Sequence, residues 1–95
     1  MKDDQVIQLQ VVQCKRGGFY KLLKRGTKCL IFERFVRGRL ESIEVFRIKI
    51  RKVNFKNFII PKRETFPHDE AFGRWAWCFT SLDRALAKFE QIENN

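Results

Sequence analysis

The last third of the chain, residues 72 to 92, constrains the fold most strongly. It reads FGRWAWCFTSLDRALAKFEQI, an aromatic stretch that runs without a break into the pattern of an amphipathic helix. Thr80 and Ser81 are suitable N-caps, because a hydroxyl accepts a hydrogen bond from an amide of the first helical turn. We therefore predict a strand over residues 74–80 and then a helix. Apolar residues at three- and four-residue spacing form one stripe that we expect to be buried: Leu82, Ala85, Leu86, Phe89 and Ile92.

Two longer apolar stretches, residues 28–36 and 40–53, predict a pair of strands. The short connection Arg37-Gly38-Arg39 favours a tight turn, in which Gly38 can take the positive φ that such turns need. The sequence thus predicts an antiparallel hairpin.

Alternation along the second strand of this hairpin predicts which side chains share a face. We expect one set to face the C-terminal helix: Phe46, Ile48 and Ile50. The opposite set would lie on the open face of the sheet, where its three basic members form a cationic ladder: Val45, Arg47, Lys49 and Arg51.

The remaining segments have weaker patterns. Residues 5–13 alternate in part and fit either a half-buried strand or a loosely attached terminal segment, and residues 19–24 fit a short strand after a Gly17-Gly18 turn. Residues 54–67 predict a loop, since Pro61 is unsuited to a central strand. A short helical turn is expected within residues 67–72, closed at Gly73.

Together these segments predict an α+β fold, in which an antiparallel sheet of about four to five strands has one C-terminal helix packed on one face. A chain of 95 residues is long enough for one core and too short for two, so we expect a single domain over residues 1–95, with residues 1–4 disordered.

The three cysteines, Cys14, Cys29 and Cys78, are widely spaced and form no Cys-x-x-Cys pair. With a single histidine, they predict neither a disulfide framework nor a metal site, and no cofactor is implied. We expect reduced, mostly buried thiols in a cytoplasmic protein. No apolar run is long enough to span a membrane, and the polar start MKDD does not resemble a signal peptide.

Positive charge is concentrated in the middle of the chain. Residues 15–63 hold 16 basic and 3 acidic side chains, whereas the whole chain has a net charge of +9. This excess predicts an acidic partner, either nucleic acid bound without base specificity or an acidic protein. Phe55 and Phe58 are either core residues or exposed rings beside this charge. The candidate nucleic-acid-binding residues are Arg34, Arg37, Arg39, Arg47, Lys49, Arg51, Lys52, Lys56, Lys62 and Arg63.

Catalysis has little support in the sequence. His68, Asp69 and Glu70 are consecutive and follow a proline, so they fit a solvated turn better than a converging active site. No catalytic residue is predicted, and an enzyme would require a cleft that joins His68 to a distant carboxylate. The alternative to polyanion binding is a protein-interaction module or homodimer. It would use a free strand edge or a surface patch formed by Trp75 and Trp77. We expect these two rings to share one side of their strand, where they form either such a patch or part of the core.

Residues 44–92, which include EVFRIKIRK and the aromatic stretch, resemble small uncharacterised proteins of phages and conjugative elements in gut bacteria. The matching features are Phe72-Gly73, Ala76-Trp77, the helix start at Ser81-Leu82, and Ala85 with Phe89. The resemblance implies a small protein carried by a mobile element. Its motifs are structural, so it implies no catalytic residue and no ligand.

Overall fold

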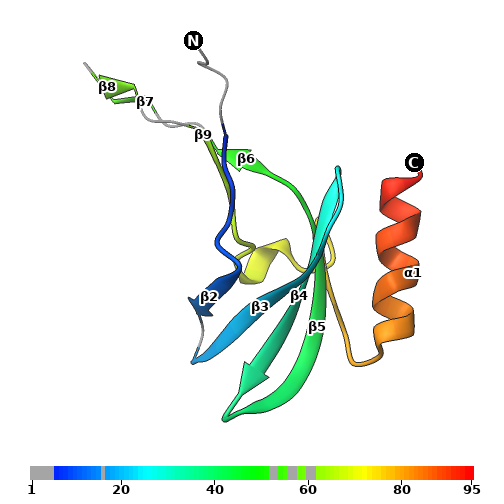
Figure 1. Cartoon of the computed structure of the whole chain (residues 1–95). Coiled ribbons are helices and arrows are strands. Elements are labelled where there is room, and N and C mark those ends of the chain that lie inside the picture. The colour runs from blue at the N-terminus through cyan, green and yellow to red at the C-terminus, as the bar shows by residue number, and fades with distance from the viewer. Residues whose placement is uncertain (1–5, 16, 52–53, 56–57, 60–61) are drawn as a thin grey trace.

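The computed structural model describes residues 6–15, 17–51, 54–55, 58–59 and 62–95. An antiparallel sheet of five strands, in the order β10-β5-β4-β3-β2, packs against the C-terminal helix α1 (Figure 1). The predicted α+β fold is therefore confirmed, whereas the predicted disorder of residues 1–4 lies outside the described residues. The strands of this sheet are β2 (Val12–Lys15), β3 (Gly18–Arg25), β4 (Cys29–Val36), β5 (Arg39–Arg47) and β10 (Ala76–Phe79).

The predicted hairpin is formed by β4 and β5. Its two turn residues both have positive φ, 53° at Arg37 and 77° at Gly38, and such turns match the right-handed twist of the flanking strands. The second strand is shorter than predicted, because β5 ends at Arg47 and the chain then leaves the sheet.

Helix α1 (Leu82–Glu93) begins where the sequence predicts. The Ser81 hydroxyl accepts a hydrogen bond from the Arg84 N–H at 3.5 Å, and Ala85, Phe89 and Ile92 are buried. Leu82 is 45% exposed, so its predicted burial is wrong. The buried stripe of the helix begins one turn later, at Ala85, because Leu82 occupies the first helical position.

Both faces of the five-stranded sheet carry buried side chains. The face toward α1 is built from Cys29, Ile31, Ile43 and Val45, whereas Tyr20, Leu30, Phe32 and Phe46 lie on the other face. The second face is not open. Phe66 and Trp75 pack against its cluster. The short helix η1 (Asp69–Ala71) lies on the side of the sheet opposite α1 (Figure 1).

The prediction that Phe46 and Ile48 face the helix is therefore wrong. Both side chains belong to the cluster on the far face, and Val45 faces α1 instead. Ile50, the third member of the predicted set, lies in another sheet and is 46% exposed. Alternation could not choose the face, because β5 is buried on both sides from residue 42 to residue 46.

A second, smaller sheet lies at the end of the molecule away from the β4–β5 turn (Figure 1). Its central strand β9 (Lys62–Glu64) pairs in parallel with β1 (Val6–Ile7) and antiparallel with β6 (Ile50–Arg51). Two further strands, β7 (Asn54–Phe55) and β8 (Phe58–Ile59), pair with each other. The predicted loop over residues 54–67 is wrong, since strands of two or three residues are too short to show a period.

The predicted strand over residues 5–13 is divided between the two sheets. Its beginning forms β1 in the small sheet, and its end enters β2, an edge strand of the large sheet. Pro61, which led us to predict a loop nearby, lies outside the described residues.

The two tryptophans lie on opposite faces of the large sheet, so the prediction that they share one side is wrong. Trp77 lies in β10 and packs in the cluster beneath α1, whereas Trp75 packs against Phe46 on the far face, with ring centroids 6.4 Å apart. Strand alternation does not extend to Trp75, because this residue lies in a turn in which its N–H donates to the Ala71 carbonyl. Both rings are half-buried within core clusters, which favours the core interpretation.

The thiols differ from the prediction in their exposure. Cys29 is buried and burial raises its pKa to about 12, with a further contribution from the Glu93 carboxylate. Cys14 and Cys78 are exposed, so the prediction of mostly buried cysteines is wrong. Within the described residues, no helix has the length and apolar character that crossing a membrane requires.

Candidate anion-binding groove

The predicted cationic ladder does not form. Arg47 is the last residue of β5 and lies opposite Cys29, on the face toward α1. Lys49 lies beyond the strand, with its Nζ 5.6 Å from the centroid of the Trp75 ring. Arg51 belongs to β6 in the small sheet. The three side chains are separated because the chain leaves the large sheet immediately after Arg47.

The other predicted residues are also dispersed. Arg34 is half-buried on the face away from α1, where its guanidinium lies 6.0 Å from the centroid of the Tyr20 ring. Arg37 and Arg39 are exposed at the β4–β5 turn. Lys52 and Lys56 lie outside the described residues, and Lys62 is half-buried in β9.

Two of the predicted residues are brought together. Arg51 of β6 and Arg63 of β9 are direct partners across an antiparallel pair, so their side chains leave the same face of the small sheet. Both are exposed, and no ion pair joins either one to an acidic side chain among the residues that the structure describes. Like charges placed directly opposite each other destabilise a sheet, so this pairing favours the binding of an anion.

Arg51 and Arg63 line a groove of about 410 Å³. Lys15, at the end of β2, provides a third cation, and its Nζ lies 5.7 Å from the centroid of the Phe66 ring at the groove wall. Residues 7–10 and Gln13 also line the groove. The groove therefore combines positive charge, amide groups and one aromatic ring.

Glu64 also lines the groove, but its charge is already compensated. Arg25 of β3 donates two hydrogen bonds of 2.9 Å to its carboxylate, and the Leu9 N–H donates a third of 2.9 Å. Burial acts to raise the pKa of Glu64, yet these hydrogen bonds and the guanidinium charge outweigh burial and lower it below its ordinary value. The Arg25–Glu64 pair ties β9 to the large sheet and leaves the positive charge of the groove uncancelled.

Sequence reasoning missed Lys15 and the glutamines Gln8, Gln10 and Gln13. The only available signal was the Gln-rich character of residues 5–13, which indicates a weakly specified strand rather than a binding surface. Lys15 is 36 residues from Arg51 in sequence, and only the meeting of β2 with the small sheet brings them to one groove.

His68 lines a neighbouring hollow with Pro67 and Asp69, and this hollow shares Lys15 and Phe66 with the groove. The carboxylate in this hollow belongs to the residue next to His68, not to a distant part of the chain. The condition that would favour an enzyme is therefore not met within the described residues, and the absence of catalysis stays a prediction.

No protein-family model, curated protein or solved structure matches this chain. The resemblance of residues 44–92 to proteins of phages and conjugative elements therefore stays a prediction, as does the cytoplasmic location.

Proposed function

We propose that this protein is a small basic accessory protein that binds nucleic acid without base specificity, through the groove formed by Lys15, Arg51 and Arg63. The observation that carries the proposal is the opposed pair Arg51 and Arg63, whose repulsion a phosphate would relieve. Amide groups and the Phe66 ring add hydrogen-bond donors and a stacking surface, which suit a single strand with accessible bases.

The groove itself contains no arrangement that would read one base against another. Its basic side chains are long and exposed, and phosphate contacts of this kind set affinity and position rather than sequence. The expected ligand is therefore an extended polyanion, and free inorganic phosphate would bind much more weakly because it engages fewer cations at once.

Fluorescence anisotropy with labelled oligonucleotides of random sequence tests the proposal. With three phosphate contacts, the logarithm of the affinity should fall with the logarithm of the salt concentration at a slope of about −2 for a single strand and about −3 for a duplex. The double variant Arg51→Gln/Arg63→Gln should weaken binding at low salt by about tenfold or more and reduce the slope by about 1.5.

The matched control is Arg39→Gln/Arg47→Gln, which removes the same charge from exposed positions outside the groove. It should change the affinity much less than the groove variant. Equal losses in the two variants would show that binding depends on diffuse charge, and a flat salt response in the wild type would refute nucleic-acid binding altogether.

A further inference from the structure

The face of the large sheet that carries α1 is only partly covered. Helix α1 packs on β4, β5 and β10, whereas β2 and β3 form the other half of this face. Phe35 is four residues beyond Ile31 along β4, so its side chain leaves the same face as the core beneath the helix. The β4–β5 turn extends past the start of α1 (Figure 1).

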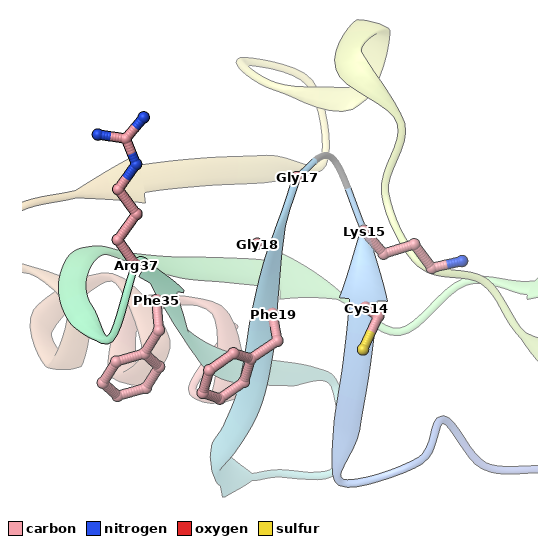
Figure 2. A pocket seen from close by; sticks show the side chains of 7 residues that line it. All are labelled: Cys14, Lys15, Gly17, Gly18, Phe19, Phe35 and Arg37. Atoms are coloured by element: carbon pink, nitrogen blue, oxygen red, sulfur yellow. The ribbon is translucent and has the colours of Figure 1, made fainter.

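A row of apolar side chains crosses this uncovered part. Cys14 lies opposite Phe19, Phe19 opposite Phe35, and Phe35 opposite Leu40, so one residue from each of four neighbouring strands shares the face. We call these four residues the apolar row. The two rings are stacked, with centroids 5.2 Å apart and an interplanar angle of 15°. Figure 2 shows both rings and the Cys14 thiol pointing to the same side of the sheet.

The apolar row is accessible to a partner. Phe19 is 39% exposed, Leu40 is 51% exposed, and Val12 on the neighbouring part of β2 is 49% exposed. Exposed apolar side chains that are contiguous across strands mark an interaction surface more often than scattered ones do. The row is thus a continuation of the core face with no described element over it.

The charges around the apolar row indicate the chemistry of the partner. Lys21 follows Phe19 two residues along β3 and shares its face, and Arg37 lines the hollow beside the two rings. Glu33, opposite Lys21, is the acidic residue on this part of the face. A second copy of the chain would bring the same basic rim and a net charge of +9, so self-association is opposed by repulsion.

We propose that the apolar row binds an acidic amphipathic helix of another protein, which would lie beside α1 on the same face of the sheet. Its apolar stripe would cover Phe19, Phe35 and Leu40, and its acidic flanks would meet Lys21 and Arg37. Helix α1 is the structural precedent, since it buries its own apolar stripe on the adjacent half of this face. This surface is distinct from the groove proposed for nucleic acid.

Binding is tested with a synthetic peptide of about five helical turns that carries leucine at positions i, i+3, i+4 and i+7 and glutamate elsewhere. Anisotropy of the labelled peptide should show saturable binding. Phe19→Ser and, separately, Leu40→Ser should each weaken it by about tenfold or more. Circular dichroism establishes that each variant is folded. If one variant fails to fold, the other still tests the proposal.

Three controls separate this proposal from its alternatives. Ile50→Ser removes a similarly exposed apolar side chain from the small sheet and should leave the affinity unchanged. Arg51→Gln/Arg63→Gln should weaken oligonucleotide binding by about tenfold or more while it preserves peptide binding. A peptide with lysine in place of glutamate should bind at least about tenfold more weakly, because it meets the same basic rim.

Several results would overturn the proposal. They are the absence of peptide binding, equal losses for Phe19→Ser and Ile50→Ser, and equal affinity for the acidic and basic peptides. Sedimentation equilibrium of the wild type should show a monomer. A dimer that disappears in Phe19→Ser would instead assign this face to a second copy of the chain.

Discussion

Glu93, near the end of α1, connects the helix to the β3–β4 turn, and its removal gives the sharpest test of the fold. Its carboxylate accepts hydrogen bonds from the backbone N–H groups of Thr27, Lys28 and Cys29, at 2.8 to 3.0 Å, and from the Thr27 hydroxyl at 2.8 Å. Desolvation acts to raise the pKa of Glu93, but these hydrogen bonds outweigh it and lower the pKa to about 2.

We expect Glu93→Gln to destabilise the protein by about 1 to 2 kcal/mol. Hydrogen bonds to a charged group contribute about 1.5 to 3 kcal/mol each, but water can replace most of them at this accessible site. For a domain of this size the loss corresponds to a fall in Tm of roughly 5 to 15 °C. Urea denaturation at neutral pH, followed by circular dichroism, measures the change in the free energy of unfolding.

The pH dependence of this loss tests its cause. Because the pKa of Glu93 is lower in the folded protein than the value of about 4.3 in an unfolded chain, the stabilisation is complete above about pH 5 and disappears as the pH falls toward 2. The difference in stability between the wild type and Glu93→Gln should therefore shrink over this range.

Two further variants complete the test. Glu90→Gln, one turn earlier on an exposed face of α1, should change stability by less than about 0.5 kcal/mol. Gly26→Ala should be destabilising, since its added Cβ would collide with the Glu93 carboxylate and the Phe89 ring. A stability of Glu93→Gln equal to that of Glu90→Gln, or a difference from the wild type that does not change with pH, would refute the role assigned to this carboxylate.

Three other substitutions have defined outcomes. Arg25→Gln should lower the free energy of unfolding, measured by urea denaturation, by about 2 kcal/mol, because the carboxylate of Glu64, which is 7% exposed, loses its charged donor. An unchanged free energy of unfolding would show that water replaces the ion pair. Arg63→Gln should stabilise the ligand-free protein by about 0.2 to 1 kcal/mol by removing the repulsion from Arg51, and a loss of stability would contradict that repulsion. Gly38→Ala places a side chain at a φ of 77° and should lower the Tm by roughly 4 to 8 °C, whereas an unchanged Tm would mean that the turn relaxes.

Local patterns in the sequence were sufficient for the elements that depend on neighbouring residues. The helix over residues 82–93 follows from its apolar spacing and from the Ser81 cap, and the β4–β5 turn follows from Gly38 between two apolar stretches. These features are encoded within about ten residues, where backbone preferences and side-chain periodicity act directly. The same information predicted the α+β class.

The sequence by itself thus determined the helix, the hairpin and the excess of positive charge. Tertiary structure decided which face of β5 meets α1, because residues 42–46 of that strand are buried on both faces and alternation cannot rank the two. It also decided that residues 66–75 cover the second face, that Trp75 and Trp77 lie apart, and that Lys15 joins Arg51 and Arg63 in one groove. These outcomes depend on contacts between residues that are distant in sequence. A local sequence pattern does not determine the free energies of such contacts.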